Sequence, residues 1–455
     1  MASYDVNSPC VFDFRYGSHE MRKIFGYSNL ISKYVFVEKI LVKALGKANL
    51  INNECVSALE KCLDNINSEM ISKEVIEMEK VLGHEITALI YLLEKYCGSC
   101  GRYIHFGATS NDIIDTSWAL IIREALGIVK KRLSGVITAL IDLVEKYGEY
   151  LMIGRTHGQH ALPITLGFKL SNYIYEFSRS YERICETEKR VIRGKMSGAV
   201  GTMAGWEDKG LFIERESMKE LDLEPHLIST QVVPRDGFAE LALVLAILAS
   251  QLDRFALEVR ELSRPEINEI YEVSDKIGSS TMPHKKNPVT AERISGLARA
   301  TRSLAVSFLE NIVLMHERDL SNSSFERYAI PHMFLLIDQI LIDMMNLLNN
   351  IWFNKESMLR NIELSKKTIL SERILLELIK RGASRQEAHS RLSKLARESI
   401  ERNESFEEIL SRDDYIVKYL NRDEINKLLT YDYLGSYREL IGRTINYAKE
   451  ILSRC

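Results

Sequence analysis

Long stretches of the chain repeat apolar residues at the spacing of an amphipathic α-helix. Between about residues 28 and 97, apolar positions such as Ile31 and Tyr34 recur every three or four residues. No proline occurs between Pro9 and Pro163, so nothing in this stretch forces a helix to break. The pattern predicts several uninterrupted helices before residue 163.

The same period continues through the middle of the chain. It predicts long helices over residues 128–147, 161–193, 236–263, 288–316 and 330–353. The 236–263 segment is almost wholly apolar at its centre, and a helix that is apolar all round is buried among other helices. From about residue 361 the chain is more charged and predicts shorter helices. The fold class that follows is all-α.

These helical patterns divide the chain into three expected domains. They are an N-terminal helical domain (1–110), a central domain built as a bundle of long helices (111–360) and a C-terminal helical domain (361–455). A length of 455 residues allows about three domains. Hydrophobic residues make up 46% of the chain, which supplies a large core and excludes a disordered protein.

Charge and terminal sequence narrow the class of protein further. The formal net charge is −3 and both signs are mixed along the chain, so we expect neither a nucleic-acid partner nor a membrane-surface role. The N-terminus shows no secretory signal. The longest apolar run, 238–249, contains Glu240 and is too short to span a bilayer. We therefore expect a cytoplasmic protein whose basic groups act locally.

The cysteines do not form the pattern of a secreted disulfide framework. There are 7, an odd number, and they are scattered along the chain. Cys97 and Cys100 form a C-x-x-C, but no second pair with zinc spacing exists, so we expect no metal site. Two thiols are the favoured expectation for this pair, with a local or intersubunit disulfide as the alternative.

The most distinctive polar stretch is residues 278–288, which read G-S-S-T-M-P-H-K-K-N-P. Its two prolines exclude a regular helix, and Lys285 and Lys286 add positive charge. Asn287 and Pro288 are typical of the N-cap and first position of a helix, whose positive end would then face the loop as an anion site. A basic surface loop with a good cap is the structural alternative.

Four further polar segments separate the predicted helices, at 83–85, 104–112, 154–160 and 316–327. Each also has a purely structural interpretation. His84 could simply begin a helix, Ser110 could cap one, and His157 could be a buried histidine in a tight turn. The Gly-rich segment 194–205 matches neither a dinucleotide-binding nor a Walker motif.

The 278–288 loop resembles the signature of the fumarase/aspartase superfamily of lyases, G-S-S-x-M-P-x-K-x-N-P, at all eight fixed positions. His284, after the first proline, resembles the adenylosuccinate lyase branch. The superfamily pattern T-H-x-Q-x-A-x-P is present at 156–163, and the segment from 316 resembles the H-E-R-D element of that branch. Five such motifs cover roughly residues 10–440 in a consistent order.

The resemblance implies an all-α lyase of the fumarase/aspartase type, whose long-helix bundle forms the core of a homotetramer with active sites shared between subunits. The implied reactions are cleavage of adenylosuccinate to AMP and fumarate, and of the succinyl-carboxamide ribonucleotide (SAICAR) to AICAR and fumarate. These are steps of purine biosynthesis. They proceed by β-elimination with a general base and a general acid, and they require no cofactor.

The same resemblance implies the catalytic residues. The base is the first serine of the signature, and a histidine gives a proton to the leaving nitrogen. Lys285 would stabilise the doubly charged carboxylate of the carbanion, because preorganised positive charge lowers the barrier to forming it. Glu292 would orient the histidine. The implied catalytic set is Ser279, His157, His84, Lys285 and Glu292.

Substrate-binding residues are implied in all of the motifs. Arginines suit phosphate because the planar guanidinium pairs with two oxygens at once, and small hydroxyl residues suit carboxylates. The implied set is Arg15, Tyr16, Gly83, Glu85, Thr109, Ser110, Thr156, Gln231, Ser280, Asn287, Arg293, Arg318, Ser323 and Arg327.

Two alternatives remain at this stage. A sister lyase acting on argininosuccinate or on fumarate and malate would have no use for the arginines expected to hold phosphate. A non-catalytic structural protein on the same fold would have no reason to keep Ser279, Lys285 and His157 together.

Overall fold

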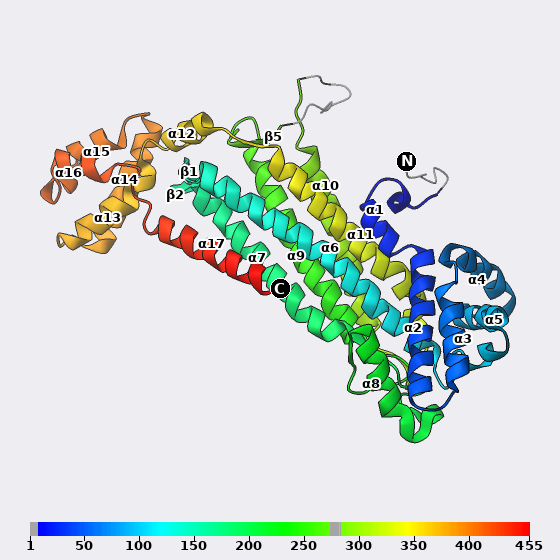
Figure 1. Ribbon diagram of the computed structural model, residues 1–455. Helices are drawn as coiled ribbons and strands as arrows, with labels where there is room; N and C mark the ends of the chain where they lie inside the picture. The colour runs from blue at the N-terminus through cyan, green and yellow to red at the C-terminus, as the bar shows by residue number, and fades with distance from the viewer. Residues whose placement is uncertain (1–7, 274–281, 283) are drawn as a thin grey trace. The chain divides into compact units, whose positions relative to one another are not determined.

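The computed structural model describes residues 8–273, 282 and 284–455 (Figure 1). Its α-helices are α1 (His19–Ile24), α2 (Tyr27–Lys47), α3 (Asn53–Asp64), α4 (Ser68–Leu82), α5 (Glu85–Cys97), α6 (Ser110–Tyr147), α7 (Leu166–Val191), α8 (Gly210–Leu221), α9 (Asp236–Leu262), α10 (Val289–Glu310), α11 (Ser321–Asn349), α12 (Lys355–Glu363), α13 (Ser371–Lys380), α14 (Arg385–Glu401), α15 (Phe406–Arg412), α16 (Arg422–Leu428) and α17 (Tyr437–Arg454). The strands are β1 (Leu151–Thr156), β2 (Gln159–Thr165), β3 (Arg193–Gly194), β4 (Glu224–Pro225), β5 (Ile270–Glu272) and β6 (Ile351–Phe353). The predicted all-α class is confirmed.

Contacts divide the chain into two compact units. Unit 1 comprises residues 1–133, 180–250 and 296–342, and unit 2 comprises residues 134–179, 251–295 and 343–455. The long helices α6, α7, α9, α10 and α11 each contribute residues to both units. The expected division into three consecutive domains stays a prediction.

In unit 1, α2 supplies the central apolar face. Its residues Ile31, Leu41 and Leu45 are fully buried, and they pack in one cluster with residues of α3, α4, α5 and α8. The same cluster includes Trp206, which is 1% exposed. The indole Nε1 of Trp206 donates to the carbonyl of Phe106 at 2.8 Å. This core therefore reaches directly to the 104–112 loop.

The predicted helix over 161–193 is wrong in its first five residues, which form strand β2. β1 and β2 pair antiparallel, with Leu151 opposite Thr165 and Thr156 opposite Gln159. Pro163 is unfavourable inside a helix, whereas it is tolerated in a short two-stranded sheet. The helix α7 begins only at Leu166, after the hairpin has returned.

The start of α11 also differs from the prediction of a polar loop up to residue 327. The helix begins at Ser321 because the carboxylate of Asp319 accepts from the Ser321 amide at 2.7 Å. It then continues through Pro331. By length and composition α11 could cross a membrane, but 67% of its most apolar window is buried within the fold, as in a core helix.

The expectation of thiols at Cys97 and Cys100 is wrong. Cys97 forms a disulfide with Cys62, and Cys100 forms one with Cys55. Cys55 and Cys62 lie seven residues apart on α3, so both face the end of α5 and the following 3-10 turn. The alternative of a local disulfide is nearer the structure, although the two cysteines pair with α3 and not with each other. Cys10 is a free thiol.

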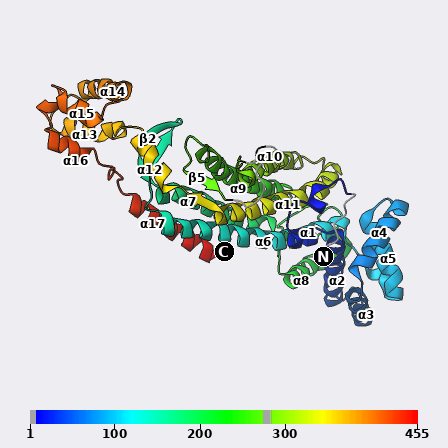
Figure 2. The same cartoon turned by 90° about the horizontal axis from the view of Figure 1, so that it is seen from above.

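In unit 2, the C-terminal helices α13–α16 enclose a separate apolar cluster that includes Phe406 and Leu410. α17 lies beside α7, as Figure 2 shows, and the ring centroids of Tyr175 and Tyr447 are 5.4 Å apart. The side chains of Tyr437 and Arg438 donate to Glu149, which lies just after the end of α6. These contacts join the C-terminal helix to the long helices of the same unit.

Candidate active site

In unit 1, a buried ion pair between Asp112 and Lys195 fixes the 104–112 loop. The side chains of Asp112 and Lys195 are both 0% exposed, and Nζ of Lys195 lies 2.6 Å from Oδ1 of Asp112. The same carboxylate accepts from the amides of Thr109 at 2.7 Å and Ser197 at 2.8 Å. Asp112 therefore fixes the Thr109 backbone to the Gly-rich segment 194–205.

Three predicted binding residues from distant segments, one of them on this loop, contact one another through their side chains. The amide nitrogen of Gln231 donates to Oγ1 of Thr109 at 3.5 Å, and Nη1 of Arg318 donates to Oε1 of Gln231 at 3.4 Å. These are long hydrogen bonds, which a ligand with better acceptors could displace. Ser110 begins α6 directly after Thr109.

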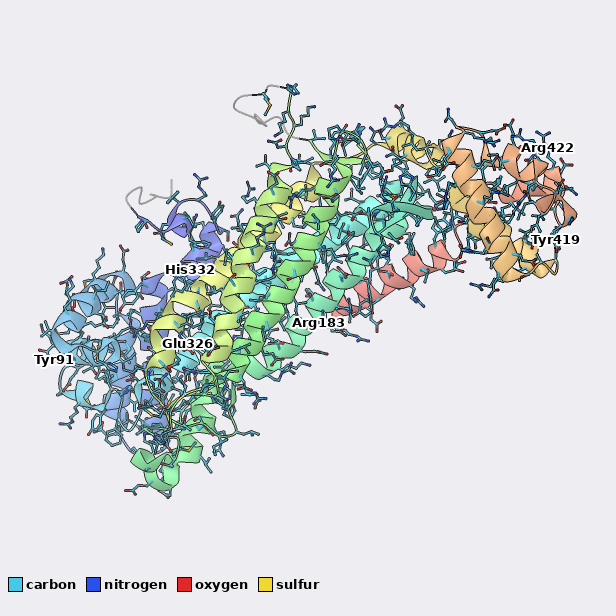
Figure 3. All side chains as sticks on the ribbon, turned by 180° about the vertical axis from the view of Figure 1, so that it is seen from behind. Tyr91, Arg183, Glu326, His332, Tyr419 and Arg422 are labelled. Carbon is cyan, nitrogen blue, oxygen red and sulfur yellow. A yellow bond between two sulfur atoms is a disulfide. The ribbon has the colours of Figure 1, made fainter. Side chains whose placement is uncertain are left out.

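Arg318 lies close to a second buried network, and it lines one cavity with two of its members, Arg235 and Glu326. Arg235 donates to Oδ1 of Asp115 at 2.9 Å, and its Nε lies 3.1 Å from Oε1 of Glu326 on α11 (labelled in Figure 3). Asp115 also accepts from the amide of Val233 at 2.9 Å. This network holds the segment that follows Gln231 against α6 and α11. Burial lowers the pKa of the nearby Arg318.

His84 is the N-cap of α5, and its Nδ1 accepts from the amide of Thr87 at 3.3 Å. That bond places the proton of the neutral ring on Nε2. Partial burial, then the charges of Arg318 and Arg327, lower the pKa of His84. His84 therefore presents a neutral N–H donor beside two guanidinium groups. We call His84, Thr109, Gln231, Arg318 and Arg327 the unit 1 cluster.

Two neighbours complete the surroundings of this cluster. Nη2 of Arg327 donates to the buried carboxylate of Glu85 at 3.2 Å, and burial raises the pKa of Glu85. Ser323 lines a 20 Å³ cavity together with Arg318 and Arg327. Gly83 ends α4 in the left-handed conformation with φ 71°, which sets the direction of the chain into His84.

Arg15 and Tyr16 follow a short 3-10 turn in unit 1. The side chain of Arg15 is exposed, and the carbonyl of Tyr16 accepts from Arg22 at 3.5 Å. No contact found among the described residues joins either side chain to the unit 1 cluster. Their predicted role at the phosphate stays a prediction.

Sequence reasoning missed His105, which lies on the same loop as Thr109. Its ring Nδ1 lies 2.6 Å from the buried carboxylate of Glu38, and its amide donates to the same carboxylate at 3.1 Å. Burial is the largest single influence on the pKa of His105 and lowers it, but the charge of Glu38, the hydrogen bond to Glu38 and the charge of Asp112 together raise it. The signal in the sequence was Glu38 itself, a charged residue inside the apolar stripe of α2.

In unit 2, His157 occupies the tip of the β1–β2 hairpin. His157 and Gly158 form a two-residue turn with φ of 54° and 73°, the pattern of a type I′ turn. A positive φ is unusual for histidine, and it exposes the ring at the tip. Thr156 pairs with Gln159 directly beneath the turn.

The signature segment is described only in part. Ser279 and Ser280 lie outside the described residues. Lys285 and Glu292 are exposed, and the amide of Glu292 donates to the Pro288 carbonyl at 3.0 Å in the first turn of α10.

The predicted cap of this helix is displaced by one residue. α10 begins at Val289, and the amide of Thr290 donates to Glu272 of β5 at 3.0 Å. The carboxylate of Glu272, which precedes the 278–288 loop, therefore accepts a hydrogen bond from the first turn of α10, the role that was expected of Asn287. Arg293 forms two bonds to the buried Asp343, at 2.7 and 2.6 Å.

Comparison with known proteins finds two regions of the chain that match described families. Residues 13–301 match the family described as "Lyase", and residues 368–444 match "Adenylosuccinate lyase C-terminus". The chain is 40% identical to the adenylosuccinate lyase of Pyrococcus abyssi over 97% of this chain and 98% of that protein. It is 38% identical to the adenylosuccinate lyase of Aquifex aeolicus over 91% of this chain and 94% of that protein.

Solved structures of related lyases have the same fold. A fumarate lyase from Mesorhizobium sp. BNC1 superposes with a TM-score of 0.87 at 28% identity, covering 94% of this chain and 98% of that one. A 3-carboxy-cis,cis-muconate lactonizing enzyme from Pseudomonas putida gives 0.86 at 26% identity, covering 97% and 99%. The fold of the fumarase/aspartase superfamily, expected from the signature loop, is confirmed. With matches to both family regions and about 40% identity over nearly its whole length, the chain belongs to the adenylosuccinate lyase family.

Proposed function

We propose that this protein is the purine-biosynthesis lyase that cleaves adenylosuccinate to AMP and fumarate, and SAICAR to AICAR and fumarate. The observation that carries the proposal is the unit 1 cluster. It gathers two arginines, a neutral histidine N–H, a threonine hydroxyl and an amide from four separate segments. A succinylated nucleotide offers a phosphate and two carboxylates to such a set.

Phosphate is the acceptor that suits Arg318 and Arg327 best. Two guanidinium groups provide paired donors to its oxygens, and charge-assisted bonds of this kind are about twice as strong as neutral ones. The protonated Nε2 of His84 adds a donor without adding a third positive charge. Thr109 and Ser110 then remain for a carboxylate of the succinyl group.

The proposed reaction is an elimination across the carbon–carbon bond of that succinyl group. Ser279 takes a proton from the carbon next to a carboxylate, and the electron pair moves into that carboxylate. Lys285 and Asn287 stabilise the extra charge on its oxygens. The pair then returns to form the double bond of fumarate as the carbon–nitrogen bond breaks, and His157 gives a proton to the leaving nitrogen.

We further propose a cytoplasmic homotetramer in which one site draws residues from several subunits. Apolar residues exposed on the long helices support this assembly, since water is a poor environment for them. On α9, Ile247 is 42% and Leu257 47% exposed, and Phe168 on α7 is 39% exposed. Neither nucleic acid nor membrane has a part in the proposal.

An ultraviolet assay of the purified protein with adenylosuccinate tests the activity and the base together. The wild type should consume adenylosuccinate and release fumarate. Ser279→Ala should lower kcat by about 10²–10⁴-fold, the usual loss for a general base. The matched control is Ser453→Ala near the exposed end of α17, which should keep wild-type activity. Equal activity of the two variants would contradict the assignment of the base.

A further inference from the structure

Glu269 of unit 2 is a buried carboxylate that the proposed chemistry leaves without a role. Its side chain is 0% exposed and lies immediately before β5. The backbone is fixed on both sides. Its amide donates to the Leu262 carbonyl at 2.9 Å, and its carbonyl accepts from the Asn354 amide at 2.9 Å. Glu269 is thus tied to the end of α9 and to the cap of α12.

Both oxygens of this carboxylate are directed at the β1–β2 hairpin. Arg155 of β1 donates to them in a bidentate pair, from Nη1 at 2.8 Å and from Nη2 at 2.7 Å. Asn361 of α12 donates to the same carboxylate at 2.8 Å. A bidentate arginine–carboxylate pair fixes orientation as well as distance. Arg155 therefore has one position relative to α12 and β5.

Arg155 is two residues before His157, and the opposite strand is anchored at the same level. Arg155 pairs across the hairpin with His160, and the ring Nδ1 of His160 lies 2.6 Å from Oγ of Ser365. Burial, then the charge of Arg155, lower the pKa of His160. Both strands are thus held by side chains one residue pair below Thr156 and Gln159.

The hairpin needs such anchors. An isolated two-stranded hairpin is marginally stable in water at best. Its turn places His157 at φ 54°, a backbone conformation that residues other than glycine rarely adopt. Further from the turn, Ile153 of β1 packs in the apolar cluster of unit 2. Nearest to the turn, Arg155 and His160 supply the side-chain bonds that hold the two strands.

We infer that Glu269 is a positioning residue for His157: held by Asn361, it fixes Arg155 and with it the hairpin that presents the histidine to the leaving nitrogen. The inference rests on the proposed role of His157 as the acid. Glu269 itself touches no substrate. Its effect should appear in the chemical step, since the residues proposed for phosphate belong to unit 1.

The test compares Glu269→Gln, Arg155→Gln and the double variant in steady-state kinetics with adenylosuccinate. Glu269→Gln keeps the shape but removes the charge that holds the guanidinium. A displacement of about 1 Å at a reacting group lowers kcat by roughly 10–100-fold, while KM should change by less than about threefold. The double variant should resemble each single variant, because both remove one interaction.

Asp413→Asn is the matched control for stability. Asp413 is also a buried carboxylate of unit 2, and it accepts from Nε of Arg391 at 2.7 Å. This control should lower the unfolding temperature and leave kcat at the wild-type value. Equal falls in kcat for Asp413→Asn and Glu269→Gln would overturn the inference, as would independent, multiplying losses in the Arg155–Glu269 cycle.

Two further variants separate the possible failures. If Glu269→Gln does not fold, Asn361→Ala tests the inference in its place, because it removes only one of the bonds to the carboxylate of Glu269. Asn361→Ala should lower kcat about two- to tenfold. An unchanged kcat in Asn361→Ala would then reject the inference. His157→Gln tests the assumption beneath it. Wild-type kcat in His157→Gln would refute the proposed acid, whereas its loss with a normal Glu269→Gln would refute the positioning role alone.

Discussion

At the residue scale, the buried pair of Asp112 and Lys195 governs the loop that carries Thr109. Both side chains are fully buried, and Nζ of Lys195 has a second partner in the carbonyl of Gly198 at 3.3 Å. A buried ammonium without its carboxylate is strongly unfavourable, whereas removing both charges leaves no uncompensated group. A change to this pair should therefore affect both the free energy of unfolding and the position of the Thr109 loop.

We expect Asp112→Asn to lower the free energy of unfolding by about 3–5 kcal/mol, the usual cost of breaking a buried pair. The double variant Asp112→Asn with Lys195→Met should regain part of that loss. KM for adenylosuccinate should rise in both, because the Thr109 amide loses its charged acceptor. Denaturant unfolding and steady-state kinetics measure the two effects. A double variant less stable than Asp112→Asn would contradict this explanation.

The pair of His105 and Glu38 should make stability depend on pH in a defined direction. The folded-state pKa of His105 is raised by Glu38, so the folded protein binds its proton more tightly than the unfolded chain. The stabilisation is therefore complete below the ordinary histidine pKa of about 6.5 and is lost as pH rises through the folded-state value. Glu38 is buried, so water screens the pair only weakly.

We expect Glu38→Gln to cost roughly 1.5–3 kcal/mol at pH 6, the range for a hydrogen bond to a charged group, and less at pH 9. Thermal unfolding at the two pH values measures the difference. The matched control is Glu149→Gln, which breaks an exposed pair with Arg438 that contains no histidine. Its cost should be equal at both pH values. A cost of Glu38→Gln that grows with pH would reverse the argument.

At the element scale, two disulfides join α3 to the end of α5 and the turn that follows. They close segments of 45 and 35 residues, between Cys55 and Cys100 and between Cys62 and Cys97. Cross-links of this length stabilise mainly by restricting the unfolded chain, typically by 2–4 kcal/mol each. The turn leads directly into the 104–112 loop, so the cross-links also limit the movement of that loop.

Cys62→Ser should therefore lower the unfolding temperature, and reduction of the wild type with dithiothreitol should lower it further. Calorimetry with and without the reductant provides the measurement. Cys10→Ser, which removes a free thiol, should leave the unfolding temperature unchanged. The same unfolding temperature for oxidised wild type and Cys62→Ser would show that this bond contributes nothing to stability.

Most of the elements could be predicted because their signal is local. The periods of α2, α9 and α10 are visible in consecutive residues. The resemblance to the superfamily implied Thr109, Gln231 and Arg318 as binding residues, and the structure brings their side chains together. The errors arose where distant residues decide. Nothing near Cys97 shows that Cys62 faces it, and the cap of α10 comes from Glu272, which precedes the loop.

The buried networks of charged residues could not be predicted from the sequence for the same reason. Asp115, Arg235 and Glu326 are separated by about a hundred residues in each direction and are ordinary charged residues in their own segments. Only the packing of α6 and α11 in unit 1 brings them together. A charged residue within an apolar stripe, as at Glu38, was the one local clue to such a partner.

At the scale of the whole molecule, the residues proposed for binding and for proton transfer belong to different units. The unit 1 cluster contains His84, and His157 belongs to unit 2. In the proposed tetramer with shared sites, His84 and His157 of one site need not come from the same chain. Two inactive variants can then complement each other.

We expect His84→Gln and His157→Gln each to be inactive alone. The two variants are mixed in equal amounts under conditions that let subunits exchange, and about a quarter of the wild-type activity should return. Half of the chains carry an intact His84 and the other half an intact His157. A site is active only when both of its histidines are intact, which random assembly gives in about one site in four. A mixture of His157→Gln with Ser453→Ala, dissociated and reassembled in the same way, controls for losses in handling. No recovery beyond the separate variants would place both histidines of a site in one chain.

The most direct test of the central claim is the rate of fumarate release by the wild type from adenylosuccinate, argininosuccinate and malate, each supplied alone. A lyase whose site is built around Arg318 and Arg327 needs the nucleotide phosphate for binding. We predict rapid release from adenylosuccinate and a kcat/KM lower by at least about 10³-fold for the two substrates without phosphate. Comparable or faster release from argininosuccinate or malate would contradict the proposed function while leaving the fold and the family intact.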